Sequence, residues 1–294
     1  MTPRESVIIA LEGGRPEGLP PHFELVYKRS LEFYGRERLE RPALEGIEGD
    51  ERQRLLRDNA KMWADIYQQL DWSICTGFWG LEDEDQFRSF EYFREYAGDT
   101  IMLSATIDGT IDSAIARAER FAAEGIEIAI MCADYCFNDG PWLSPPMFAE
   151  FVTPFLKRQV EGFQALGLYA AKHTDGDIMP ILDQLVSTGI NALHSLDPMA
   201  GVDIREVRAQ VGPELCLMGN VNCALVHAGT PEEVYRSALY CLAHGGVENG
   251  AYVFCTSNCI FEGVPLENYA AMLQARRDYG PPGAEHPAPP AEML

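Results

Sequence analysis

The feature that most restricts the fold of this chain is a regular alternation of short apolar runs with longer segments of helical periodicity. A buried parallel strand reads as a short apolar run, and a crossover helix returns the chain to the start of the next strand. Eight strands are predicted, and helical segments separate nearly all of them. The predicted strands are 22–26, 70–75, 100–104, 126–132, 168–172, 190–194, 215–218 and 251–255.

This pattern predicts an α/β fold, namely a single-domain (β/α)8 or TIM barrel. Such barrels usually need about 250 residues, and the chain has 294. The barrel is expected to occupy residues 1–280, including an N-terminal helical extension, and the proline-rich residues 281–294 are expected to form a flexible tail. A doubly wound open sheet is the alternative, but the chain lacks the glycine fingerprint that usually follows the first strand of such a sheet.

Charge and composition exclude several classes of protein. The formal net charge of −22 argues against nucleic acid and anionic membranes as partners, because both attract positive patches. No apolar run reaches the length of about 18 residues that a membrane span requires, and the N-terminus lacks the layout of a signal peptide. Because the eight cysteines lie mostly inside apolar runs, we expect reduced thiols and a cytoplasmic location. A soluble enzyme, including one that forms a homodimer, is compatible with this charge.

The strongest candidates for chemistry follow two predicted strands. In a TIM barrel the carboxyl ends of the strands meet on one face, where ligands bind. His173 and Asp175 stand beside Gly176 at the end of the fifth strand, and Asp134 follows the fourth. A carboxylate beside a histidine can orient it or share a cation with it. We predict that Asp134, His173 and Asp175 are catalytic; the alternative is that Asp175 only caps a helix and His173 only packs.

Further polar and aromatic residues are predicted to reach the same face and to bind the substrate. They are His22, Glu24, Phe78, Trp79, Tyr135, Asn138, His194, Asn220, Asn222 and Asn258. Three of the six histidines fall within predicted strands or at their ends, which exceeds an even scatter along the chain. Packing is the alternative role for Phe78, Trp79 and His194. Turn formation is the alternative for Asn220 and Asn222.

Several motifs occur in an order and at spacings that are characteristic of a known family. They are residues 134–145, residues 148–154, the sequence His173-Thr174-Asp175-Gly176, residues 217–222 and residues 264–272. Through them the chain resembles the uroporphyrinogen decarboxylase superfamily, over nearly its whole length and most clearly from Ile128 onward. The superfamily includes the decarboxylase and the methyltransferases of corrinoid-dependent methyl transfer. The resemblance implies a (β/α)8 barrel with its site at the carboxyl ends of the strands.

The decarboxylase branch fits this chain less well than the methyltransferase branches. The resemblance implies that a true decarboxylase grips the carboxylates of a tetrapyrrole with an arginine-rich N-terminal segment. The equivalent residues here, 20–25, contain no arginine and add Glu24, and the family's late histidine falls at Asn258. An acidic site is a poor host for a substrate with many carboxylates. Decarboxylation of a tetrapyrrole or of a smaller acid is therefore the second hypothesis.

A zinc site is implied by the thiol-methylating branch of the superfamily. That branch, as the resemblance implies, binds zinc through a His-x-Cys pair and a distant cysteine, and zinc lowers the pKa of the substrate thiol. In this chain the pair reads His173-Thr174-Asp175, and Cys259 lies next to the late position. A mixed zinc site on His173, Asp175 and Cys259 is the corresponding prediction, with a register shift of one residue.

The remaining branch resembles the methyltransferases that act on the methylated substrate. They take a methyl group from a methoxylated or N-methylated small molecule and pass it to the cobalt of a separate corrinoid protein. Breaking the ether or amine bond, as in O-demethylation, requires protonation or Lewis-acid coordination of the leaving group, and Asp134, His173 and Asp175 suit either role. The predicted function is a corrinoid (cobalamin)-dependent methyltransferase component with a methoxy-aryl or methylamine-type substrate. A non-catalytic barrel that binds a corrinoid is the third hypothesis.

Overall fold

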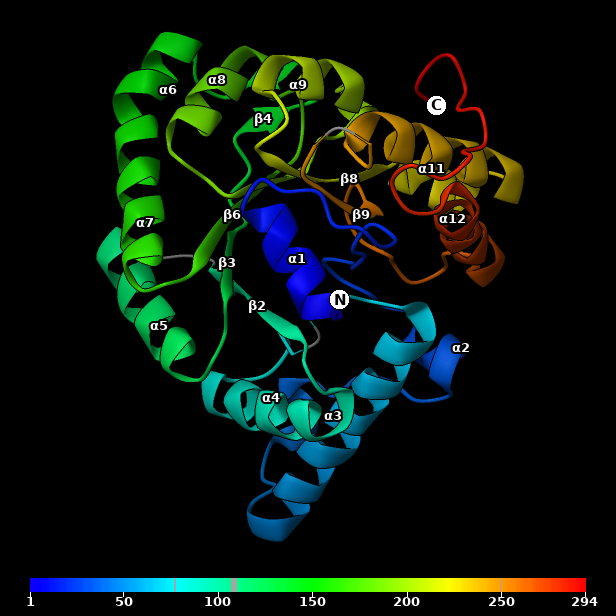
Figure 1. Cartoon of the computed structure of the whole chain (residues 1–294). Helices are drawn as coiled ribbons and strands as arrows, with labels where there is room; N and C mark the ends of the chain where they lie inside the picture. Colours follow the sequence, from blue (N-terminus) through cyan, green and yellow to red (C-terminus); the bar gives the residue numbers. More distant parts are fainter. Residues whose placement is uncertain (77, 107–109, 249) are drawn as a thin grey trace.

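The computed structural model describes residues 1–76, 78–106, 110–248 and 250–294. Within these residues, a parallel sheet of seven strands in the order β1-β2-β3-β6-β7-β8-β9 curls into a ring that helices surround (Figure 1). Its strands are β1 (Ile74–Cys75), β2 (Ile101–Thr106), β3 (Ile128–Met131), β6 (Tyr169–Thr174), β7 (Ala192–Ser195), β8 (Cys216–Val221) and β9 (Tyr252–Thr256). The predicted α/β fold of the TIM-barrel type is confirmed.

The segment predicted as the first strand closes the ring without forming a regular strand. His22 makes a parallel bridge to Phe254 of β9, and the Phe254 N–H donates to the carbonyl of Pro21 at 2.8 Å. On the other side, the Ser73 N–H donates to the carbonyl of His22 at 2.6 Å, just before β1 begins. The segment thus joins the two edge strands. Proline has no N–H to donate, so Pro20 and Pro21 cannot extend the ladder.

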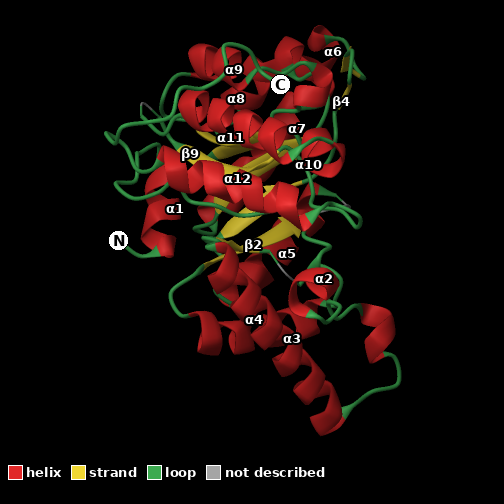
Figure 2. Ribbon diagram, turned by 90° about the vertical axis from the view of Figure 1, so that its right-hand side faces the viewer, coloured by secondary structure: helices red, strands yellow, loops and turns green. Residues whose placement is uncertain are grey.

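The helices form the outer layer, and α3 and α4 extend beyond the rest of that layer (Figure 2). None of the described helices is both long enough and apolar enough to cross a bilayer. The helices outside the ring are α2 (Ser30–Tyr34), α3 (Gly49–Leu70), α4 (Asp83–Ala97), α5 (Ile111–Ala123), α6 (Pro145–Phe151), α7 (Thr153–Ala165), α8 (Leu182–Ser187), α9 (Ile204–Val211), α10 (Cys223–Ala228), α11 (Pro231–Gly245) and α12 (Leu266–Tyr279), with short 3-10 turns at Arg41–Leu44, Met179–Ile181 and Pro198–Ala200.

Helix α1 (Pro3–Leu11) lies across one end of the ring of strands, as the views along and across the barrel show together (Figures 1 and 2). The Thr2 side chain accepts from the Glu5 N–H and the Glu5 side chain accepts from the Thr2 N–H, a capping box that fixes the start of the helix. Val7 and Leu11 are buried among the inward-facing side chains of the strands. Arg4 donates to Glu127, which immediately precedes β3. Helix α1 therefore closes the amino end of the barrel.

Side chains of each strand alternate between the barrel interior and the layer beneath the helices, as the period of two requires. In β6, Ala171 belongs to the interior cluster, whereas Ala170 belongs to the outer one. The next two residues continue the alternation: Lys172 lies on the outer side, and His173 contacts His194 on the inner side. This alternation decides which polar residues at the strand ends can reach one another.

Candidate functional site

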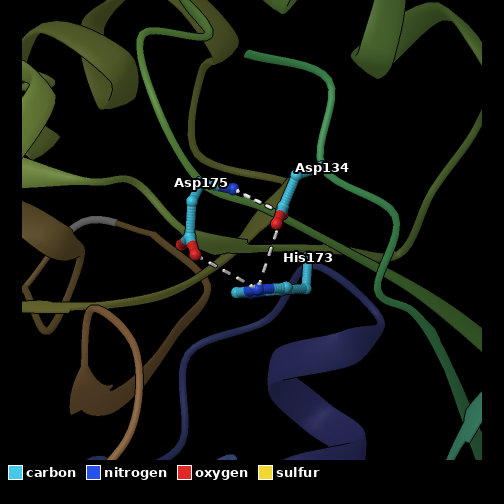
Figure 3. A group of neighbouring side chains, drawn as sticks. All are labelled: Asp134, His173 and Asp175. Carbon is cyan, nitrogen blue, oxygen red and sulfur yellow. Dashed lines mark hydrogen bonds and ion pairs between the residues drawn. The ribbon is translucent and has the colours of Figure 1, made fainter. Parts of the chain in front are cut away.

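The three residues predicted as catalytic lie together at the carboxyl ends of β3 and β6 (Figure 3). His173 Nε2 is 3.9 Å from Asp134 Oδ1 and 3.7 Å from Asp175 Oδ2. The backbone N–H of Asp175 donates to Asp134 Oδ1 at 3.0 Å. The side chain of His173 is 8% exposed and that of Asp134 is 44% exposed, so the group opens to solvent on the Asp134 side.

A sharp turn at Gly176 places Asp175 within this group. Gly176 has a φ of +85°, which favours glycine over other residues. A hairpin made of β4 (Cys136–Phe137) and β5 (Gly140–Pro141) packs directly on it, so that a Cβ at position 176 would lie 2.6 Å from the carbonyl oxygen of Phe137. The Asp177 N–H also donates to that oxygen at 2.9 Å. The turn and the hairpin therefore hold Asp134 and Asp175 on the same side of His173.

The carboxylate of Asp175 is fixed by two side chains from other strand ends. Asn258 Nδ2 donates to Asp175 Oδ2 at 2.6 Å, and the Ser195 hydroxyl donates to Asp175 Oδ1. Burial raises the pKa of Asp175 to about 6, although both hydrogen bonds favour the ionised form. Asp175 is thus mainly ionised at neutral pH, with a pKa close enough to neutrality for it to take up a proton.

His173 and His194 form a pair in which both rings are neutral at pH 7. Their Nδ1 atoms are 2.7 Å apart. Burial lowers the pKa of His173 to about 4 and, together with the neighbouring His173, lowers that of His194 well below its ordinary value. One Nδ1 must donate and the other accept. When His173 donates, its Nε2 presents a lone pair to the space between Asp134 and Asp175.

This arrangement has the donor set of a metal site. Asp134, His173 and Asp175 each offer one ligand atom, and these atoms lie within 4.8 Å of one another. One imidazole nitrogen and two carboxylate oxygens suit a divalent metal such as Zn²⁺. His194 would orient the ligating His173 in the way that outer-shell partners of metal-bound histidines do.

Cys259, which was predicted as the third zinc ligand, is not part of this group. The only cluster of three or more ligand types found among the described residues is that of Asp134, His173 and Asp175. The geometry therefore replaces Cys259 by Asp134 in the predicted ligand set.

His22 and Glu24, predicted to bind substrate, lie in the outer layer and do not reach the group around His173. Phe23, between them, points inward, with its ring 5.8 Å from that of His194. His22 Nε2 pairs with the hydroxyl of Tyr269 at 3.1 Å, and Glu24 accepts from the hydroxyl of Thr256. Burial lowers the pKa of His22 to about 3 and raises that of Glu24 to about 8. Strand alternation sends both side chains away from the mouth.

The aromatic residues predicted to wall the pocket separate into two environments. Phe78 is buried in the outer core, edge to face with Phe90 at 4.9 Å between ring centroids. Trp79 packs against the interior cluster of the barrel. The ring of Tyr135, adjacent to Asp134 in the chain, lies 4.3 Å from Lys172 Nζ. Tyr135 also packs edge to face with Phe148 of the outer core, so of these three residues only Trp79 packs against the barrel interior.

Of the four predicted asparagines, Asn258 alone contacts the group, through Asp175. Asn220 is buried in the outer layer, where its Nδ2 donates to two backbone carbonyls. Asn222 caps helix α10 by accepting from a backbone N–H of its first turn. Asn138 is exposed in the turn between β4 and β5. Two of these roles are the structural ones that asparagine commonly takes at turns and helix ends.

Sequence reasoning did not single out Lys172 and Ser195 as part of the site. Lys172 is fully buried, and its Nζ donates to the carbonyls of Met131 at 3.3 Å, of His173 at 2.6 Å and of Ala133. Burial lowers its pKa to about 7. A lysine inside an otherwise apolar strand is a usable signal, because lysine is almost never fully buried without partners. Serine gives no comparable signal.

Replacing Asn258 by leucine is expected to raise the pKa of Asp175 above about 6. The Asn258 amide donates to the ionised carboxylate, so its removal favours the neutral form of Asp175 and moves the pKa upward. A ¹³C NMR titration of the labelled aspartate carboxyls would measure the shift. Asn138→Leu, in the exposed hairpin turn, is the matched control. An unchanged or lower Asp175 pKa in Asn258→Leu would contradict the assigned contact.

Comparison with known proteins places this geometry in a family context. The family model described as uroporphyrinogen decarboxylase (URO-D) matches residues 92–279. A uroporphyrinogen decarboxylase of Shewanella pealeana is 24% identical over 221 residues, covering 71% of this chain and 57% of its own length. A methylated-thiol–coenzyme M methyltransferase of Methanosarcina mazei is 26% identical over 175 residues, covering 59% of this chain and 44% of its own length. The chain thus spans about half the length of these curated relatives.

The fold is also similar to that of a solved protein. A methyltransferase from Methanosarcina mazei superimposes with a TM-score of 0.71 at 14% sequence identity, covering 95% of this chain and 99% of that one. The family model covers residues 92–279, which include Asp134, His173, Asp175, Ser195 and Asn258. The chain therefore belongs to the uroporphyrinogen decarboxylase (URO-D) family.

Proposed function

We propose that this protein is a methyltransferase that moves a methyl group from a small methylated substrate to the cobalt of a corrinoid protein. The observation that carries the proposal is the open group of Asp134, His173 and Asp175 at the mouth of the barrel. The methylated-thiol–coenzyme M methyltransferase among the relatives supports the same class of reaction. A substrate bearing a methoxy-aryl or methylamine-type group is the proposed methyl donor.

The site suits the chemistry of a leaving group that must be stabilised. In the reaction, the bond between the methyl carbon and oxygen or nitrogen breaks, the methyl group passes to the acceptor, and the oxygen or nitrogen takes a proton. In a site without a metal, Asp175, whose pKa is about 6, can supply that proton from its minor protonated form. Asp134, the more exposed carboxylate, borders the substrate, and His194 orients the ring of His173. A divalent metal bound by Asp134, His173 and Asp175 would supply Lewis-acid polarisation of the substrate oxygen or nitrogen.

Decarboxylation is the competing function, because the family model and several relatives carry the decarboxylase name. The charges at the mouth weigh against a substrate with many carboxylates. The carboxylates of Asp134 and Asp175 both lie within 4 Å of His173 Nε2. The buried cation beside them, Lys172, uses its ammonium to bind three backbone carbonyls. Like charges at close range disfavour binding of an additional carboxylate.

A direct assay separates these functions. The Zn²⁺-loaded protein is incubated with cob(I)alamin as the acceptor and with 2-methoxyphenol or trimethylamine as the methyl donor, and formation of methylcobalamin is followed by absorbance. A parallel reaction contains uroporphyrinogen and is followed for loss of carboxyl groups. Methyl transfer that a chelator removes and added Zn²⁺ restores is the expected result. Decarboxylation of uroporphyrinogen without methyl transfer would overturn the proposal, and tight binding of cobalamin with no turnover would indicate a non-catalytic barrel.

A further inference from the structure

The environment of Lys172 is unusual for a charged side chain. The residue is fully buried on the outer side of β6, and no carboxylate of the described residues lies within ion-pair distance of its Nζ. Instead, the ammonium meets three carbonyl oxygens, and the ring of Tyr135 lies 4.3 Å from it. An ammonium group has three donors, so these carbonyls use all of them. The aromatic face adds a cation–π contact.

The three carbonyls belong to the two segments that carry the functional group. Met131 is the last residue of β3, Ala133 immediately precedes Asp134, and the third carbonyl is that of His173 itself. The β3–β6 ladder ends where Met131 pairs with Lys172. Beyond this pair the loop that carries Asp134 has no regular ladder to β6, and the Lys172 ammonium bridges the two segments in its place.

We propose that Lys172 is a positioning residue, which holds the loop of residues 132–135 against the end of β6 so that Asp134 reaches His173. Two further contacts act on the same loop: the Tyr135 N–H donates to the Thr174 hydroxyl at 3.0 Å, and the Asp175 N–H donates to Asp134 Oδ1 at 3.0 Å. Each is a single hydrogen bond, whereas Lys172 reaches Met131 and Ala133 with the same charged group. Charge-assisted hydrogen bonds such as those of Lys172 are about twice as strong as a neutral one such as that of Tyr135 with Thr174. The inference rests on the proposed function in one respect only, namely that Asp134 and His173 take part in the proposed methyl transfer.

The test measures position rather than turnover. Lys172→Met keeps an unbranched apolar chain, one atom shorter than that of lysine, and removes the donors. At a pH below 7, the Asp175 and Tyr135 amides of this variant are expected to exchange with solvent at least about tenfold faster than in the wild type, because each amide reports one contact of the loop. The Leu217 amide, which donates to Ala251 at 3.0 Å, reports global opening and is expected to stay unchanged. Wild-type exchange at Asp175 and Tyr135 in the folded variant would overturn the proposal.

Two further variants keep the test decisive. Lys157→Met is the matched control, because Lys157 is half exposed on α7 and its ion pair among the described residues is with Glu161, one turn away. All amides named above should keep their protection in this variant. Should Lys172→Met fail to fold, Lys172→Gln, which loses the charge and part of the reach, is measured in the same way. Unchanged Asp175 exchange in Lys172→Gln would equally overturn the proposal.

A second readout tests the consequence for the site. If Asp134 is a metal ligand, Lys172→Met should bind Zn²⁺ about 10–100-fold more weakly, the usual effect of losing an outer-shell contact, and Lys157→Met should bind as the wild type does. The outcomes also separate this inference from the proposed function. A wild-type protein that transfers no methyl group would refute the function, while the exchange rates at Asp175 would still decide the role of Lys172.

Discussion

Replacing His173 by alanine is expected to lower methyl transfer by about 10²–10⁴-fold, the range for loss of a group that takes part in proton transfer or activation of the leaving group. Zn²⁺ binding should be lost with it, because the imidazole is the nitrogen ligand of the group. The barrel should remain folded. The substitution leaves the Nδ1 of His194 without its partner, which costs about 1–3 kcal/mol, a fraction of the stability of an ordinary domain.

The measurement combines turnover, Zn²⁺ titration and thermal unfolding of the same preparation. His227→Ala is the matched control, because His227 is exposed at the end of α10, and it should keep wild-type values in all three. Wild-type turnover in His173→Ala would remove the central residue from the proposed chemistry. Loss of folding in His173→Ala would instead show that the pair of His173 and His194 is needed for the fold itself.

The Gly176→Ala variant is expected to show the largest loss of stability from a single methyl group. Two costs combine at this position. A non-glycine residue at a φ of +85° is strained by about 1–3 kcal/mol. The added Cβ would also lie 2.6 Å from the Phe137 carbonyl oxygen and 2.8 Å from the Cys136 carbonyl carbon, so the hairpin must move, at a further cost of about 1–3 kcal/mol or more.

A second glycine separates these two costs. Gly189 has a φ of +83°, and a Cβ there would meet no atom within 4 Å, so Gly189→Ala carries the strain without the clash. Urea unfolding of both variants, with the free energy of unfolding extrapolated to water, should place Gly176→Ala below Gly189→Ala by the cost of moving the hairpin. Equal losses in the two variants would show that the hairpin does not pack on Gly176 as described.

The fold could be predicted from sequence because the alternation of strands and helices is a long-range pattern that local errors do not disturb. The segment that closes the ring was predicted less accurately than the other strands. Residues 22–26 were predicted as a full strand, yet they form a single bridge on β9, at His22, and the chain bends at Leu25 before it can add a second. The β4–β5 hairpin was not predicted, since each of its strands has only two residues and gives no periodic signal.

The grouping of residues at the strand ends could be predicted where a residue directly follows a strand, but not where the direction of the side chain decides which residues meet. Asp134, His173 and Asp175 follow from strand ends alone. Glu24 carries a carboxylate, as the proposed catalytic residues do. It lies one position beyond the inward-facing Phe23, however, so its side chain points to the outer layer. Contacts between distant strand ends, such as that of Asn258 with Asp175, depend on loop conformations that no short sequence window encodes.

The placement of helix α1 across the amino end of the barrel has a consequence for kinetics. With that end filled, the methyl donor and the protein-borne acceptor of the proposed reaction would both have to reach His173 through the same opening. The acceptor protein, being far larger than the mouth of a barrel, would cover that mouth once it docks. In that reaction the small molecule would have to enter first and its demethylated product leave last, so steady-state rates are expected to follow a compulsory-order rather than a ping-pong pattern.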